Sequence, residues 1–113
     1  MIFWKEKALE HAKELAPNES VGLVLNSRGK TVYYPCKNIA DNPTQTFTLD
    51  PVDYAAASKN GDIIAVVHSH PTTDLVFSES DLVSCEKTKL PFYIVNPRNG
   101  EWIYREPDGY MPD

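Results

Sequence analysis

The sequence predicts an α+β fold in which a mixed β-sheet is flanked by three helices. Apolar residues recur at three- and four-residue steps over 3–16, which indicates an amphipathic helix. Two further helical segments alternate with β-rich segments. The five successive apolar residues from Ile63 to Val67 are typical of a central strand that is covered on both faces. This order of helices and strands predicts a sandwich built around one mostly mixed sheet.

The remaining elements follow from their boundary residues. Pro17 ends the first helix, and Gly22 interrupts the next strand at a point where another backbone or a ligand could approach. Asp50 and Pro51 are a capping carboxylate and a proline at the first helical position, so a second helix begins there. The predicted elements after the first helix are a hairpin of 21–25 and 31–35, a short strand at 46–49, a helix from 51 to about 58, the central strand at 62–68, a helix from 78 to about 89, and a hairpin of 92–95 and 101–105.

The chain of 113 residues is long enough to bury one hydrophobic core without disulfides or structural staples. We assign residues 1–105 to a single domain. Residues 106–113 contain two prolines and one glycine, so we expect a flexible C-terminal tail there.

The composition argues against several kinds of partner. The net charge is −5 at pH 7 and no basic run is present, so neither nucleic acid nor an anionic membrane surface is an expected partner. No apolar stretch approaches the ~20 residues of a membrane span, and the first residues lack the apolar region of a signal peptide. We therefore expect a cytoplasmic protein in which Cys36 and Cys85 are free thiols.

The end of the predicted central strand carries His68 and His70. Residues two apart on a strand point to the same side, so both imidazoles can reach one point beyond the strand end. Asp81 lies in the first turn of the helix that begins near Ser78. Two imidazoles and one carboxylate form a common catalytic zinc set whose open position holds water, and zinc lowers the pKa of that water towards ~7. The sequence therefore predicts Zn²⁺ as a cofactor, with His68, His70 and Asp81 as its ligands.

A hydrolase of this kind also needs a base that takes the proton of the water and passes it to a leaving amine. Glu19 is the candidate, because it lies at a helix-to-strand junction that could face the site. The hydroxyl of Ser78, three residues before Asp81, could donate to the oxyanion that develops on an attacked carbonyl. Taken alone, Glu19 is more typical of an exposed acid before a strand.

Several of these residues have an alternative interpretation. Ser78 and Asp81 by themselves are more typical of a helix N-cap followed by an acid in the first turn. Asp74, on the loop before that helix, could be the third ligand in place of Asp81. Cys85 could approach the metal but is more typical of a core thiol. His11, beside the apolar stripe of the first helix, is typical of a partly buried or solvent-facing histidine and not of a fourth ligand.

Together these residues resemble the signature of the JAMM/MPN+ (Mov34-type) zinc metalloprotease family. That signature is a glutamate followed after a gap by His-x-His-Pro, six residues and Ser-x-x-Asp. Here it matches Glu19, then His68-Ser69-His70-Pro71, and then Ser78-Glu79-Ser80-Asp81, with the same spacing. The resemblance implies a zinc-dependent hydrolase of amide bonds, often isopeptide bonds, on a cytidine-deaminase-like fold.

A narrower resemblance covers most of the chain. Segments 33–40, 47–54 and 61–71 are similar to the N-terminal JAMM domain of lambda-type phage tail-assembly proteins of the K type. This resemblance implies a zinc metallopeptidase or isopeptidase in phage or prophage tail assembly. Its substrate would be a protein or peptide, such as a tail protein, in the host cytoplasm if the chain is phage-encoded. One alternative is a bacterial JAMM enzyme that processes a ubiquitin-like sulfur-carrier protein, and another is a non-catalytic tail-assembly module that zinc stabilises.

Overall fold

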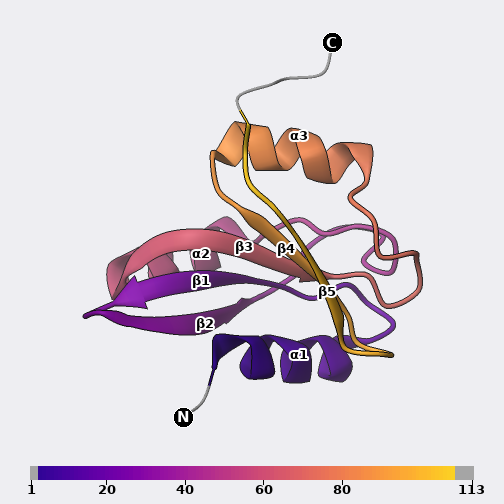
Figure 1. Cartoon of the computed structure of the whole chain (residues 1–113), viewed down its shortest axis with the longest axis horizontal. Helices are drawn as coiled ribbons and strands as arrows, with labels where there is room; N and C mark the ends of the chain where they lie inside the picture. The colour runs from indigo at the N-terminus through magenta and orange to yellow at the C-terminus, as the bar shows by residue number, and fades with distance from the viewer. Residues whose placement is uncertain (1–2, 109–113) are drawn as a thin grey trace.

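The structure, a computed structural model, describes residues 3–108 (Figure 1). Residues 109–113 of the predicted C-terminal tail lie outside the described part. None of the helices within 3–108 has the length and apolar character needed to cross a bilayer. In chain order the elements are α1 (Trp4–Leu15), β1 (Val21–Ser27), β2 (Lys30–Cys36), α2 (Pro51–Asn60), β3 (Asp62–Ser69), α3 (Glu79–Thr88), β4 (Phe92–Asn96) and β5 (Glu101–Arg105).

The strands form one mixed sheet in the order β2-β1-β3-β4-β5. The pairs β1–β2 and β4–β5 are the two predicted hairpins, and β1 also pairs antiparallel with β3. Strands β3 and β4 run parallel. Strand β3 is therefore the central strand, bonded along both edges, as its uninterrupted apolar run predicts. The predicted fold class, a mixed sheet flanked by three helices, is confirmed.

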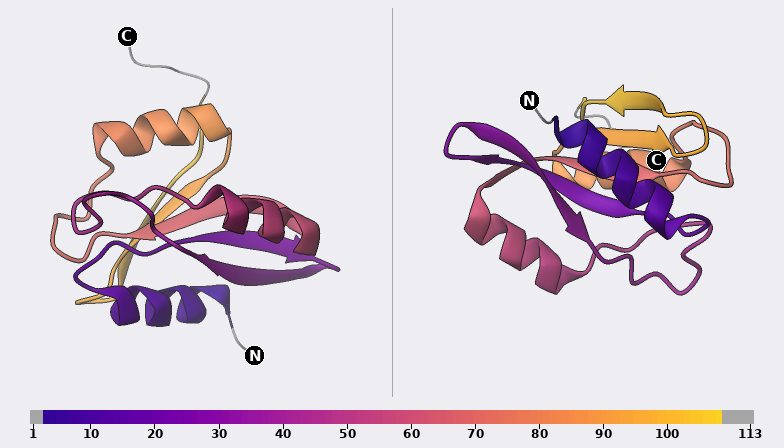
Figure 2. Two further views of the ribbon diagram at one scale, coloured as in Figure 1. Left: turned by 180° about the vertical axis from the view of Figure 1, so that it is seen from behind. Right: turned by 90° about the horizontal axis from the view of Figure 1, so that it is seen from below.

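Different helices cover the two faces of the sheet (Figures 1 and 2). On one face, Ala8 of α1 packs in a buried cluster with Val67 of β3. On the other, the thiol-bearing Cys85 of α3 joins a cluster that includes Val66 of β3 and a residue of α2, so the predicted core thiol is confirmed. Because successive strand residues alternate between faces, His68 lies with Val66 on the face of α2 and α3.

The predicted strand at 46–49 is wrong. Among the described residues, this stretch forms only a single bridge, between Asn38 and Leu49. The side-chain amide of Asn38 takes the place of a strand partner: it donates to the carbonyl of Thr46 at 3.0 Å and accepts from the N–H of Thr48 at 3.0 Å. A side chain thus satisfies backbone groups that the alternating sequence assigned to a neighbouring strand.

Gly22 gives room to an aromatic side chain. A Cβ atom at Gly22 would overlap the ring of Tyr33, which reaches across from β2. The Tyr33 hydroxyl lies 2.6 Å from Nδ1 of His11 on α1. Burial raises the pKa of Tyr33, so its hydroxyl stays protonated, and it donates to Nδ1 when the neutral imidazole carries its proton on Nε2. His11 is half-buried, as expected, and the approach predicted at Gly22 is made by a side chain and not by a backbone or ligand.

We expect Gly22→Ala to destabilise the fold by about 1–3 kcal/mol, because overpacking forces the Tyr33 ring to move. The free energy of unfolding in urea measures this cost. In a Tyr33→Ala background the clash is absent, so the same glycine substitution should cost much less there. An equal cost in both backgrounds would show that Tyr33 is not the reason for the glycine.

His11 predicts a dependence of stability on pH. Burial lowers the pKa of His11 below its ordinary value of 6.5, although the charge of Glu14 opposes the shift. At a pH between the folded and the unfolded pKa of His11, the folded state binds fewer protons than the unfolded state. The neutral His11 therefore contributes its full stabilisation above the unfolded pKa, and this stabilisation is lost as the pH falls towards the folded pKa. His11→Gln can still accept from Tyr33 but cannot titrate.

Urea unfolding of the wild type and His11→Gln at about pH 7.5 and about pH 5 measures this effect. The wild type should lose more stability on acidification than the variant does. Parallel losses in the two proteins would contradict the assignment to His11.

Candidate metal centre

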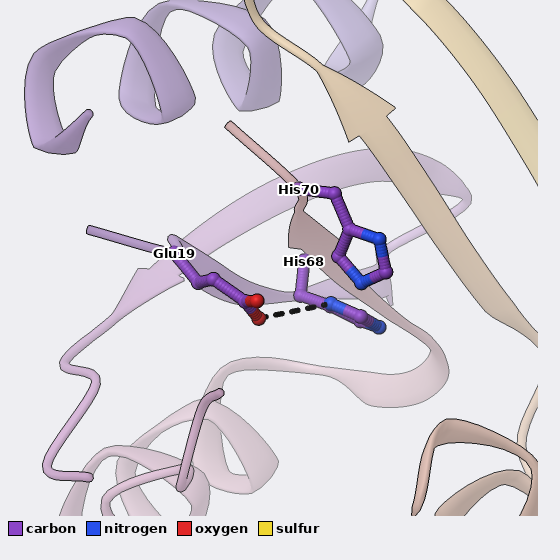
Figure 3. A group of neighbouring side chains, drawn as sticks. All are labelled: Glu19, His68 and His70. Carbon is purple, nitrogen blue, oxygen red and sulfur yellow. Dashed lines mark ion pairs between the residues drawn. The ribbon is translucent and has the colours of Figure 1, made fainter. Parts of the chain in front are cut away.

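The start of β1 is held against the end of β3 by two serines. The N–H of Ser69 donates to the carbonyl of Ser20 at 3.1 Å. The N–H of Ser20 donates to the Ser69 hydroxyl at 2.8 Å. Glu19 precedes Ser20, and His68 and His70 flank Ser69, so this pairing brings the carboxylate to both imidazoles. Figure 3 shows the three side chains gathered at one point, with Glu19 directed at His68.

Asp81 is fixed by a reciprocal cap at the start of α3. The N–H of Asp81 donates to the Ser78 hydroxyl at 3.1 Å, and the N–H of Ser78 donates to Oδ2 of Asp81 at 2.9 Å. The N-cap interpretation of Ser78 is therefore confirmed. The cap aims the carboxylate at the histidines, with Oδ1 3.3 Å from Nε2 of His68 and Oδ2 3.4 Å from Nε2 of His70.

The second ring nitrogen of His70 is held by the backbone. Its Nδ1 lies 3.0 Å from the carbonyl oxygen of Asp74, and a carbonyl can only accept, so Nδ1 carries the proton. Nε2 is then the nitrogen available to a metal, and the ring orientation is fixed, as is usual for metal-binding histidines. Asp74 thus supports His70 through its main chain, while its exposed side chain lines the adjoining cavity.

His68 supplies the test of whether a metal fits. Its side chain is fully buried, and within residues 3–108 neither ring nitrogen has a hydrogen-bond partner. Buried polar atoms without partners are rare and costly in folded proteins. Carboxylate oxygens of Glu19 and Asp81 face the two nitrogens at 3.7 and 3.3 Å. A cation bound by Nε2 of His68 and the Asp81 carboxylate would give that nitrogen a partner, so the residues fit a zinc ion, while Glu19 faces the opposite nitrogen of the ring.

Two carboxylates compete for the third ligand position. Ligand atoms of Glu19, His68 and His70 all lie within 4.8 Å of one another, so Glu19 could join a metal set. Asp81, however, has one oxygen opposite Nε2 of each histidine, whereas the ion pair of Glu19 is with Nδ1 of His68. We therefore retain Asp81 as the expected ligand and Glu19 as the expected base.

The electrostatics suit Asp81 as a ligand. Burial by itself would raise its pKa, but the contact with His70, the attraction of His68 and the hydrogen bonds from Ser78 outweigh burial and lower the pKa of Asp81. Burial would lower the pKa of His70, but its contacts with Asp81 and the Asp74 carbonyl, aided by acidic charge nearby, raise it. Asp81 is thus ionised at neutral pH, as metal binding requires.

A cavity of about 310 Å³ adjoins these groups, and its lining includes Glu19, His70, Ser78 and Asp81. A substrate can therefore reach the predicted catalytic residues. The lining also includes Gln45 and Thr46, which the sequence did not indicate as site residues. The aromatic ring of Phe47 lies 4.4 Å from that of His68, centroid to centroid. No local motif marks these residues, because they come from an irregular loop.

A mixed sheet with helices on both faces and a histidine–carboxylate cluster beyond its central strand define an α+β protein with a candidate metal centre. Residues 4–106 of the chain match the sequence profile of a family described as prokaryotic homologs of the JAB domain. The chain belongs to this family, and the resemblance inferred from the sequence is confirmed.

Individual relatives agree with this assignment. The chain is 38% identical over 104 residues to the tail tip assembly protein K of Escherichia phage N15, which covers 92% of this chain and 43% of the phage protein. It is 29% identical over 119 residues to desampylase of Haloferax volcanii, which covers 95% of this chain and 78% of that protein. The chain thus spans less than half the length of the tail protein.

A solved structure described as JAMM, a metalloprotease-like zinc site in the proteasome and signalosome, shares the fold. Its TM-score is 0.57 at 22% identity, with 96% of this chain and 86% of that chain covered.

The ligand assignment predicts that Asp81→Ala loses bound zinc while Asp74→Ala keeps it. Removing Asp81 takes away the carboxylate that faces both imidazoles, whereas alanine at position 74 leaves the carbonyl that holds His70. Metal analysis of the purified proteins after dialysis measures both. Zinc loss in the Asp74 variant alone would overturn the assignment.

Proposed function

We propose that this chain is a zinc-dependent metallopeptidase or isopeptidase that hydrolyses an amide bond in a protein or peptide. The observation that carries the proposal is the cluster at the end of β3. Two buried histidines face two carboxylates from different elements, beside a cavity that a substrate can enter. One carboxylate can hold the metal and the other remains for proton transfer.

His68, His70 and Asp81 would hold the zinc ion, which when bound supplies a Lewis acid and lowers the pKa of water. Glu19, only 3% exposed, would accept the proton of the attacking water and deliver it to the leaving amine. The Ser78 hydroxyl accepts from the Asp81 N–H, and with Ser80, 3.1 Å away, as donor in their contact, the proton of Ser78 would be donated to the developing oxyanion. The three expected zinc ligands and Glu19 are buried, which strengthens their interactions because little water screens them, whereas Ser78 is exposed.

The setting we propose is phage or prophage tail assembly, with tail proteins as substrates in the host cytoplasm. The identity to a tail tip assembly protein supports this setting. The match to desampylase supports a second candidate, in which the same chemistry processes a ubiquitin-like protein such as a sulfur carrier. A third is a tail-assembly module in which zinc only stabilises the fold.

We expect Glu19→Gln to keep bound zinc and to lower hydrolysis by about 100-fold or more, because the amide cannot take up a proton. The measurements are zinc content and cleavage of a panel of peptides and isopeptide-linked proteins, including tail proteins and a ubiquitin-like protein, with and without a chelator.

Each alternative has a distinct result in this experiment. Loss of zinc in Glu19→Gln would show that Glu19 is a ligand. No cleavage by the zinc-loaded wild type, together with normal tail assembly by Glu19→Gln, would favour the non-catalytic module.

A further inference from the structure

The side chain of Asn38, just after β2, uses all of its hydrogen-bonding capacity on backbone groups. Its amide nitrogen donates to the carbonyls of Glu19 at 2.9 Å and Thr46 at 3.0 Å. Its amide oxygen accepts from the N–H groups of Ala40 and Thr48, both at 3.0 Å. A carboxamide has two donors and two acceptor positions, so none is spare. Asn38 thereby organises the irregular segment 38–48, which we call the strap.

The strap holds both main-chain polar groups of Glu19. The carbonyl of Glu19 accepts from Asn38, and its N–H donates to the carbonyl of Pro43 at 2.7 Å. Glu19 precedes β1, so the strand ladder that fixes Val21 does not extend to it. The pairing of Ser20 with Ser69 fixes the next residue, and the strap holds the main chain of Glu19 itself, so the position of its carboxylate depends on both.

The strap also contacts other parts of the centre. Phe47 packs against the ring of His68, and Thr46 lines the cavity beside Glu19. Thr72, just beyond the histidine strand, donates through its hydroxyl to the carbonyl of Thr44 at 3.3 Å. One loop thus joins the predicted base, a predicted zinc ligand and the cavity wall.

We propose that Asn38 is the positioning residue for Glu19, an inference that rests on the proposed role of Glu19 as the base. Asn38 does not touch the reacting atoms. It fixes the conformation of the strap, and the strap in turn helps to fix the distance from the Glu19 carboxylate to the histidines. A displacement of about 1 Å in such a group can cost on the order of 100-fold in rate. The expected metal ligands are held by β3 and the cap of α3, and among the described residues the strap contacts them only through Phe47 on His68. We therefore expect zinc binding to change little when Asn38 is replaced.

Asn38→Asp is the sharpest test. The variant is nearly isosteric and keeps an acceptor for Ala40 and Thr48, but it turns an oxygen towards the carbonyls of Glu19 and Thr46. Asn38→Ser, which keeps one hydroxyl donor, is a milder second variant. Asn60→Ala is the matched control, because Asn60 is exposed at the end of α2 and its amide donates to one backbone carbonyl at 2.8 Å.

The first readout is amide hydrogen exchange, which requires no substrate. We expect exchange at Glu19 to accelerate about tenfold or more in Asn38→Asp, less in Asn38→Ser, and not at all in Asn60→Ala. Exchange at Leu23 in the core should stay unchanged. Unchanged exchange at Glu19, or equal acceleration at Leu23, would overturn the proposal whether or not the protein is an enzyme.

The second readout uses the zinc-loaded protein and any substrate that the peptide and isopeptide panel identifies. Asn38→Asp should lower kcat about tenfold or more while zinc affinity stays within about threefold. Its effect should shrink in a Glu19→Asp background, because the two residues act as one unit. Full additivity would overturn the proposal. If exchange at Glu19 accelerates in Asn38→Asp but the wild type cleaves no substrate, the positioning of Glu19 by Asn38 is supported. Only the proposed function is then contradicted.

Discussion

The centre depends on the antiparallel register between β1 and β3. Val21 lies opposite His68, and the serine pair extends this contact beyond the regular ladder. Because side chains alternate on a strand, a slip of one residue would turn the histidines to the α1 face of the sheet. The aromatic contact above Gly22 packs β2 and α1 against β1, the strand whose register with β3 places the centre.

Buried carboxylates beside buried imidazoles give the site its chemical character. Burying an ionised carboxylate is costly unless it is paired or bound to a metal. Asp81 recovers much of this cost through the cap on α3, and the Nδ1 proton of His70 is held by a carbonyl. The two ring nitrogens of His68 receive no such compensation among the described residues. Asp81 and His70 are thus fixed by hydrogen bonds, while the unpartnered Nε2 of His68 lies where a cation would bind.

The sequence predicts those features that depend on local patterns. The apolar run of β3, the His-x-His spacing and the cap of α3 are all readable, and the regular elements end within two residues of their predicted bounds. The conformation of the strap cannot be predicted from a local sequence pattern. Its order comes from one asparagine bonded to segments on both sides, so alternation at 46–49 suggested a strand that does not form. The partner of Gly22 also required the structure, because Tyr33 lies on another strand.

The parts of the centre differ in how they are held. The expected zinc ligands lie at the end of a central strand and in a capped helix turn, which are rigid elements, whereas the expected base is anchored by an irregular loop. Changes in that loop at Asn38 are therefore expected to move Glu19 more than the metal ligands, which among the described residues the loop contacts only through Phe47 on His68. Metal binding and hydrolysis are separable properties in such a design. Zinc binding alone would therefore not make this chain an enzyme, and in the function proposed above the position of Glu19 is the feature that would separate a hydrolase from a structural module.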